Sequence, residues 1–281
     1  MATTLDAPAL TDVELQQLLS LLSGARTAVL TGAGVSTDSG IPDYRGEGAP
    51  VRNPMTFQTF VASERARKRY WAGSHLGWQS FGIARPNRGH AALVTLELGG
   101  VVSGVVTQNV DGLHTRAGSR HVVDLHGSMD RVVCLDCGQH FARSAIAERL
   151  EAANPDFSTP GAIRLAPDGD VEVDDIDHLV VPECTVCGGV LKPDVVFFGE
   201  FVPVDKFQAA ASLVQRSDVL LIAGSSLVVN SGIRLLELAR KRRMPIVVVN
   251  RGVTKGDSRA TLKLEAGTSE TLEAIAGGLL A

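Results

Sequence analysis

Apolar residues follow helical spacing in several stretches of the chain. In the first predicted helix, Leu15, Leu18, Leu19 and Leu22 recur at helical spacing, and Thr11 or Asp12 precedes it as a candidate N-terminal cap. The same pattern of apolar and polar positions predicts further helices near 88–98, 205–216, 232–243 and 268–279.

Short continuous apolar runs lie between these helices. They predict strands near 27–30, 101–107, 122–125, 219–223 and 246–249. Valine-, isoleucine- and leucine-rich strands that alternate with helices favour a parallel sheet with both faces covered. We therefore expect an α/β fold with a doubly wound, Rossmann-like parallel sheet.

Two stretches interrupt this alternation. Residues 46–87 are rich in arginine and aromatic residues and predict a helical insert, whereas residues 131–189 hold two cysteine pairs and an acidic run from Asp168 to Asp177. We expect one domain over 1–281 with a smaller inserted module. Its large lobe would be built from about 12–45, 88–130 and 190–281, and its small lobe from the two inserts.

Composition excludes several classes of protein. The chain has 281 residues, of which 44% are hydrophobic and 21% charged, and its net charge of −4 gives no basic field for nucleic acid. No apolar run reaches the roughly 18 residues of a membrane span. The first 25 residues contain no lysine or arginine, which argues against a secretory signal. We expect a soluble, cytoplasmic protein with no membrane or direct nucleic-acid partner.

The four cysteines form two identical pairs. Cys134 and Cys137 are separated by two residues, as are Cys184 and Cys187, and each pair runs into glycine. In a reducing compartment this spacing predicts tetrahedral thiolate ligation, with zinc as the natural metal and iron as an alternative. Two disulfides or chance spacing is the competing interpretation. Four thiolates leave no open position for water, so the predicted metal is structural.

A glycine-rich loop follows the first predicted strand. Gly32 and Gly34 would let a pyrophosphate approach the backbone, and the N-terminus of a following helix would favour its charge. Thr37 occupies the position of the third glycine of the dehydrogenase fingerprint, so a tight strand-to-helix turn is an alternative. Two later loops, beginning at Gly224 and Asn250, also follow strands and strengthen the prediction of a nucleotide site at that edge of the sheet.

Polar residues follow two further strands. Asn109 and Asp111 alternate after one strand and can grip a ligand amide. His126 follows another strand and is a candidate general base near neutral pH. Structural roles are the simpler interpretation for the remaining histidines considered, which are His75, His114, His121 and His140.

These motifs resemble the sirtuin family. The stretch from Gly32 to Arg45, the segment 107–111, His126-Gly127, the two cysteine pairs and the segment 192–200 occur in the family's order, followed by Gly224-Ser225 and Asn250. The resemblance covers about residues 15 to 280. Within the family, the stretches 69–72, 77–78 and 125–137 are most similar to class II.

The resemblance implies an NAD site, with NAD consumed as a substrate. Ile41, Asn109 and Asp111 would hold the nicotinamide carboxamide, and Gln108 would approach the adjoining ribose. The full set of NAD-binding residues implied is Gly32, Ala33, Gly34, Thr37, Ile41, Asp43, Tyr44, Arg45, Gln108, Asn109, Val110, Asp111, Gly224, Ser225, Ser226, Asn250, Arg251, Gly252 and Thr268.

The resemblance also implies the reaction. The acyl oxygen of a modified lysine attacks the ribose anomeric carbon as nicotinamide leaves, and His126 then acts as general base on the ribose hydroxyls. Asn109 and Asp111 complete the implied catalytic set. An acylated-lysine peptide would bind as an added strand. The residues implied for peptide binding are Val196, Phe197, Phe198, Gly199, Glu200, Val228 and Val229.

Alternatives to protein-lysine deacylation remain open from sequence. A mono-ADP-ribosyltransferase would use the same NAD site, and a non-catalytic NAD-sensing module would lack a working base. Family members that prefer succinyl or malonyl lysine carry a Tyr-x-x-Arg pair where this chain has Ser74-His75-Leu76-Gly77. The missing arginine favours acetyl or a longer neutral acyl chain.

Overall fold

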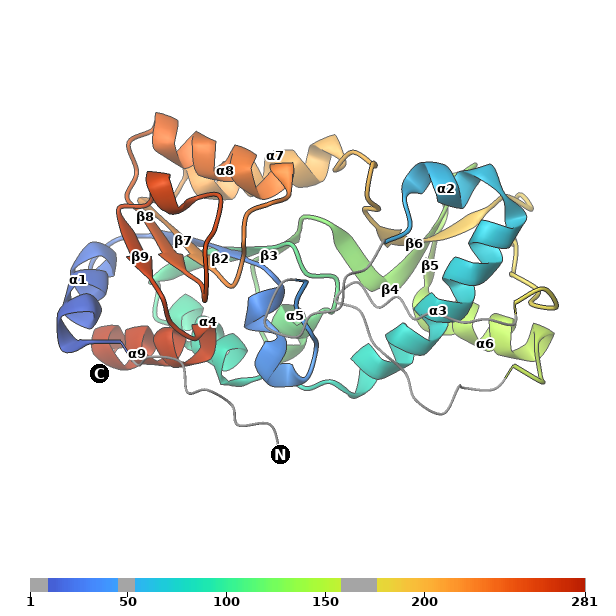
Figure 1. Ribbon diagram of the computed structural model, residues 1–281, viewed down its shortest axis with the longest axis horizontal. Coiled ribbons are helices and arrows are strands. Elements are labelled where there is room, and N and C mark those ends of the chain that lie inside the picture. The colour runs from blue at the N-terminus through green and yellow to red at the C-terminus, as the bar shows by residue number, and fades with distance from the viewer. Residues whose placement is uncertain (1–9, 45–53, 158–175, 281) are drawn as a thin grey trace.

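The computed structural model describes residues 10–44, 54–157 and 176–280, and its larger part is built on a six-stranded sheet (Figure 1). The strand order is β3-β2-β1-β7-β8-β9, and every pairing is parallel. Along the chain, β1, β2 and β3 follow one another toward one edge of the sheet, and β7, β8 and β9 follow one another toward the other edge. The direction in which strands are added therefore reverses between β1 and β7. Their bounds are β1 Thr27–Thr31, β2 Val102–Thr107, β3 Val122–Asp124, β7 Val219–Ala223, β8 Ile246–Val249 and β9 Leu262–Leu264.

Helices cover both faces of this sheet. Ala28 and Leu30 of β1 pack into the apolar core beneath α7 and α8, whereas Val29 packs into the core beneath α1, α4 and α9. Successive strand residues point to opposite faces, so a run of five buried positions needs helices on both sides. The helices are α1 Asp12–Leu22, α4 Arg88–Leu98, α5 Leu113–Ala117, α7 Val204–Gln215, α8 Asn230–Lys241 and α9 Thr268–Leu280.

A second, antiparallel sheet lies at the other end of the molecule, in the order β5-β4-β6 (Figure 1). Its own apolar core is centred on Trp71 and Phe60. Arg143 is buried in that region, with its guanidinium over the rings of Trp71 (4.7 Å) and Trp78 (5.4 Å). The elements are α2 Phe57–Ala62, α3 Glu64–Ile83, β4 Gly127–Cys134, β5 His140–Ala142, α6 Arg143–Ala153 and β6 Leu191–Val195.

The predicted α/β fold with a doubly wound parallel sheet is therefore confirmed. The helix predicted from the leucines begins where its cap was expected, because Thr11 and Glu14 form a reciprocal capping box. One local expectation is wrong: no α-helix begins directly after Gly34. The chain instead makes two short 3₁₀ turns, Ala33–Val35 and Thr37–Ser39, and leaves them at Gly40 with a φ of +81°.

In the part of the chain that the structure describes, no helix is long and apolar enough to cross a lipid bilayer. The acidic run predicted from Asp168 onward lies almost wholly outside the described residues, as does Arg45.

Two buried histidines predict an acid-sensitive fold. The rings of His90 and His114 lie 4.7 Å apart, and burial lowers the pKa of His90 to about 4 and that of His114 to about 3. The unfolded chain protonates them near their ordinary value of 6.5, so between these values it binds more protons, and stability falls as pH falls. From pH 7 to pH 5, His90 alone should cost about 2 kcal/mol of unfolding free energy.

Urea unfolding at several pH values measures this effect. His90→Gln should flatten the loss of stability between pH 7 and pH 5. His140→Gln, at an exposed position on β5, should leave the slope of the wild-type chain unchanged. Equal slopes in all three proteins would contradict the assignment.

Candidate functional site

The loops that carry the predicted site leave one edge of the parallel sheet. The strands β1, β2, β3, β7 and β8 end at Thr31, Thr107, Asp124, Ala223 and Val249, and the candidate residues follow these ends. Ligands of doubly wound sheets bind at this edge, where the strand order reverses. Here the reversal lies between β1 and β7, so the loops beginning at Gly32 and Gly224 flank it.

Those two loops pack backbone against backbone. Gly34 N donates to Gly224 O at 2.9 Å. A β-carbon added to Gly34 would lie 2.8 Å from the Gly224 α-carbon, and one added to Gly32 would lie 2.7 Å from the Gly224 carbonyl oxygen. Glycine is therefore required here by the contact between the loops as well as by any ligand that approaches them.

The start of α9 packs against the turn that follows Gly34. The hydroxyls of Thr37 and Thr268 both donate to Gly34 O, each at 3.1 Å. Asn87, the cap of α4, donates to Val35 O at 2.8 Å. Two distant segments, the start of α9 and the cap of α4, thus hold the glycine turn in one conformation.

A compact hydrogen-bonded group joins the first two strand-end loops. Asn109 Nδ2 donates to Gly32 O and to Ser36 Oγ, both at 3.1 Å, and Ser36 Oγ donates to Asp111 Oδ2 at 2.7 Å. The other oxygen of Asp111 accepts the N–H of Leu113 at 2.9 Å. Burial raises the pKa of Asp111, and the bonds from Leu113 and Ser36 oppose that rise.

Ser36 is the residue of this group to which the sequence assigned no role. Its position inside the glycine-rich segment was the available signal, but a serine in a turn has many possible partners. Only the fold shows that Ser36 links Asn109 to Asp111. Ile41, only 2% exposed, belongs to the core and directly follows this turn.

His126 follows β3 and makes a hydrogen bond at each ring nitrogen. Its Nδ1 lies 3.0 Å from Gln108 O, and its Nε2 lies 2.8 Å from Ser231 Oγ. A carbonyl oxygen can only accept, so Nδ1 carries the proton and Nε2 offers its lone pair. Burial lowers the pKa of His126 to about 4, partly offset by the Gln108 carbonyl, so the imidazole is neutral at pH 7. A neutral imidazole whose Nε2 is unprotonated is the form that a general base needs.

The backbone of His126 continues into the segment predicted to bind peptide. Val196 N donates to His126 O at 2.8 Å, just after β6. Gly127 has a φ of +85°, and a β-carbon there would collide with the Asp194 carbonyl oxygen, so the two chain segments cross in close contact. The candidate base and the candidate peptide segment are therefore held together.

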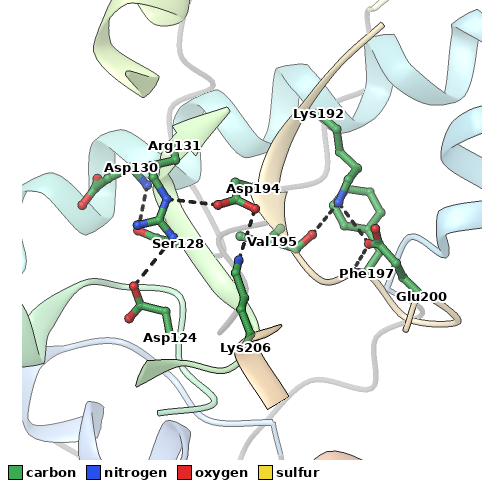
Figure 2. A network of polar contacts seen from close by, with 10 residues as sticks. All are labelled: Asp124, Ser128, Asp130, Arg131, Lys192, Asp194, Val195, Phe197, Glu200 and Lys206. Carbon is green, nitrogen blue, oxygen red and sulfur yellow. Dashed lines mark hydrogen bonds and ion pairs between the residues drawn. The ribbon is translucent and has the colours of Figure 1, made fainter. Parts of the chain in front are cut away.

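A buried ion pair shapes the segment after β6. Lys192 Nζ donates to Val195 O at 2.6 Å and to Glu200 Oε2 at 3.0 Å (Figure 2). The same Glu200 oxygen accepts the N–H of Phe197 at 2.8 Å, which closes the turn on itself. Phe198, 43% exposed, lies edge-on to Tyr44 with ring centroids 6.4 Å apart, so the turn reaches the end of the glycine-rich loop.

Asp194 of β6 belongs to a charged cluster that joins the small sheet to the larger part of the molecule. It accepts from Arg131 of β4 at 3.0 Å and from Lys206 of α7 at 3.3 Å, and Arg131 also lies 3.8 Å from Asp124 of β3 (Figure 2). Two cations from different elements thus meet on one carboxylate beside His126. These contacts hold the small sheet in a defined place relative to the edge of the parallel sheet that carries the candidate site.

The loops at the far end of the sheet are also ordered. Asn250 Nδ2 donates to the carbonyls of Arg251 (2.7 Å) and Gly252 (3.2 Å), and Gly252 N donates to Glu265 at 2.7 Å. Ser225 Oγ donates to Gln108 Oε1 at 2.6 Å, which joins the loop after β7 to the loop after β2. Of the remaining predicted residues, Asp43 follows the glycine turn after β1, Val110 lies in the loop after β2, and Ser226, Val228 and Val229 lie in the loop after β7.

The four cysteines meet at one point beyond β4. Their sulfur atoms all lie within 4.8 Å of one another, with Cys134 and Cys187 at 3.5 Å and Cys137 and Cys184 at 3.8 Å. Zinc–thiolate bonds of about 2.3 Å place tetrahedral sulfurs about 3.8 Å apart, which these distances match. The thiols are free, so two disulfides are excluded and a structural zinc fits.

The histidines that were given structural roles have partners outside the set of candidate site residues. His114 is buried against Thr31 and His90, and His121 pairs with Glu97 at 2.8 Å. His75 lies inside α3 beside Glu151, and His140 is exposed on β5.

Comparisons with known proteins agree with this geometry. Residues 32–231 match the family model described as the Sir2 family. NAD-dependent protein deacetylase 1 of Mycobacterium avium is 52% identical over 270 residues, covering 95% of this chain and 96% of the relative. The mitochondrial NAD-dependent protein lipoamidase sirtuin-4 of Bos taurus is 46% identical over 269 residues, covering 93% of this chain and 84% of the relative.

A solved structure supports the same conclusion about the fold. A Sir2 protein bound to a propionylated peptide superposes with a TM-score of 0.75 at 30% identity, covering 95% of this chain and 99% of that one. The sequence-based resemblance, including its similarity to the class that contains sirtuin-4, is confirmed.

Proposed function

The chain belongs to the Sir2 family and is an NAD-dependent protein deacylase, and from that premise we propose which residues carry out its reaction. The lysine acyl group is transferred to the ADP-ribose part of NAD, and nicotinamide is released. The observation that carries this assignment is His126: a neutral imidazole with Nε2 unprotonated, at the strand edge where NAD sites form. We assign it as the general base.

His126 takes the proton of a ribose hydroxyl on Nε2 while Nδ1 keeps its bond to Gln108. The ribose oxygen then attacks the carbon of the acyl group that has already joined the ribose, and water completes the release of free lysine. Because the proton moves to Nε2 only, the Gln108 carbonyl stabilises the imidazolium that forms.

Asn109 and Asp111 are assigned to the nicotinamide carboxamide, with Ile41 closing that side. The support is their mutual bracing through Ser36, which fixes an amide and a carboxylate in one place. A pocket that is rigid before the ligand arrives can hold the nicotinamide ring out of plane and so assist its departure. The glycine turn, with Thr37, Thr268 and Ser225, is assigned to the phosphates and riboses.

The peptide is assigned to the segments 196–200 and 228–229, as an added strand bonded through backbone groups. The Lys192–Glu200 pair supports this, because Glu200 also accepts the N–H of Phe197 and the two bonds fix the shape of the first segment. Such pairing reads peptide sequence weakly, so the acylated lysine would be the main recognition element.

We assign acetyl or a longer neutral chain as the acyl group. Ser74 and Gly77 of α3 offer no cation at the positions where an arginine would bind a carboxylated chain. Of the three nearby arginines expected on a solvated helix face, Arg65 and Arg69 are exposed to solvent, whereas Arg67 is half-buried and donates to the carbonyl of Val61.

Mass spectrometry of an acyl-lysine peptide panel tests the proposal. Acetyl, longer fatty, lipoyl and succinyl peptides are incubated with and without NAD. We expect NAD-dependent loss of neutral acyl groups with matching acyl-ADP-ribose, and succinyl turnover at least tenfold slower than the best neutral chain. Preferred removal of succinyl would contradict the acyl assignment, and ADP-ribose attached to protein without free lysine would favour ADP-ribosyl transfer.

A further inference from the structure

No sequence motif assigned a role to Ser231, yet its hydroxyl lies 2.8 Å from the Nε2 of His126. It sits in the first turn of α8 and is buried, with 6% of its surface exposed. A serine at that place can bond to the free N–H groups of its own helix. Here it points away to the imidazole instead.

The other ring nitrogen of His126, Nδ1, determines the direction of the hydrogen bond between Ser231 and Nε2. Because Nδ1 of His126 donates to the Gln108 carbonyl, Nε2 is an acceptor and the Ser231 hydroxyl donates to it. The ring is therefore held at both nitrogens, from the loop after β2 on one side and from α8 on the other.

The loop that delivers Ser231 is itself fixed to the same place. Ser225 Oγ, at the start of this loop, donates to Gln108 Oε1 and accepts the N–H of Leu227 at 3.3 Å. Leu227 is buried with a φ of +54°, a left-handed conformation that leucine adopts only where its surroundings impose it. A β-carbon on Gly232 would lie 3.1 Å from Gln108 Nε2, so α8 begins in close contact with this residue.

We propose that Ser231 is a positioning residue for His126: its hydroxyl at Nε2, opposite the Gln108 carbonyl at Nδ1, holds the imidazole in the tautomer and orientation from which it acts as base. The inference rests on the proposed role of His126. Nε2 has one lone pair, so the ribose hydroxyl replaces Ser231 there when it binds, and it meets a ring that is already aligned. The N-terminus of α8 adds its positive dipole end, which favours the neutral imidazole before NAD binds.

The experiment compares two reactions in the zinc-loaded full chain. Nicotinamide exchange reports the step before the base acts, whereas deacylation includes the base step. Ser231→Ala should lower kcat for deacylation about fivefold, because the imidazole is then no longer aligned when the ribose hydroxyl arrives, with exchange and NAD affinity unchanged. Ser231→Thr, which keeps the hydroxyl, should restore most of the rate, and Ser212→Ala on α7 serves as a matched control.

A spectroscopic measurement separates alignment from folding. In long-range ¹H–¹⁵N spectra, the Nε2 resonance of His126 should shift in Ser231→Ala and return in Ser231→Thr, while Nδ1 stays protonated in all three proteins. Equal loss of exchange and deacylation, an unchanged or faster deacylation rate, or an unmoved Nε2 resonance would each overturn the proposal. Full turnover by His126→Ala would instead remove the base assignment itself, independently of any result at Ser231.

Discussion

His126→Ala is expected to lower the rate of deacylation by about 10²–10⁴-fold, the range that a general base contributes, while nicotinamide exchange persists. The imidazole is bonded to Gln108 and Ser231, and the variant leaves the glycine turn and the Asn109–Ser36–Asp111 group intact. NAD should therefore still bind and still lose nicotinamide reversibly. Steady-state deacylation and exchange of labelled nicotinamide measure the two steps separately.

Asp111→Asn is expected to impair nicotinamide exchange as well as deacylation, in contrast to His126→Ala. Asparagine keeps the size of the side chain but removes the charge that accepts from Ser36 and from the N–H of Leu113. Exchange and deacylation should then fall together, by about 10-fold or more, because the pocket that we propose for nicotinamide is disturbed before the proposed base acts. His140→Ala on β5 should match the wild-type chain. Unchanged exchange in Asp111→Asn, or full deacylation by His126→Ala, would refute the corresponding role.

Cys137→Ser is expected to remove bound zinc and to lower Tm by about 10 °C or more. The four sulfurs lie within 4.8 Å of one another and come from two segments, one at the end of β4 and one before β6. A metal bound by all four would join these two segments and so contribute folding free energy. Metal analysis after gel filtration and calorimetry measure the two effects. A strong chelator should produce the same destabilisation in the wild-type chain.

Val186→Ala is the matched control for the cysteine variant. Val186 lies between Cys184 and Cys187, but its side chain is 66% exposed, so its truncation should change neither zinc content nor Tm measurably. A Cys137→Ser protein that is folded, active and free of metal would exclude the structural zinc.

Much of the parallel sheet was predictable because its elements are locally consistent. The runs 219–223 and 246–249 are continuous apolar stretches with a glycine or an asparagine directly after them, and β7 and β8 have those bounds. The helix predicted at 88–98 is α4, because Asn87 caps it and Gly99 ends it. In these cases, local propensity and tertiary burial favour the same structure.

The antiparallel sheet was not predictable in the same way. The strand β6 contains Lys192, Pro193 and Asp194 within five residues, which is no strand pattern. Lys192 is buried there because Glu200 and Val195 satisfy its charge, and Asp194 is held by Arg131 and Lys206. These compensations come from other segments, so a local pattern cannot reveal them.

The residues of the candidate site likewise differ in whether a local sequence pattern could reveal them. Motifs that lie within a few consecutive residues, such as 107–111 and the glycine turn, were found from sequence. Ser231 was missed because its partner His126 is 105 positions away, and a serine in the first turn of a helix has nothing unusual about it. The expected helix after Gly34 was wrong, since contacts from Thr268 and Asn87 hold that segment in tight turns.

The crossing of His126-Gly127 with Asp194–Val196 limits how enzymes of this kind can be recombined. A chimera that exchanges the cysteine-bearing segment for that of a homologue must join the two sequences somewhere along β4 and β6. A joint at Gly127 would bring a foreign carbonyl against a position with no room for a β-carbon. A joint at Val196 would replace the partner of the His126 carbonyl. Functional chimeras should therefore have both junctions beyond Gly127 and before Asp194, so that the crossing is inherited whole from one parent.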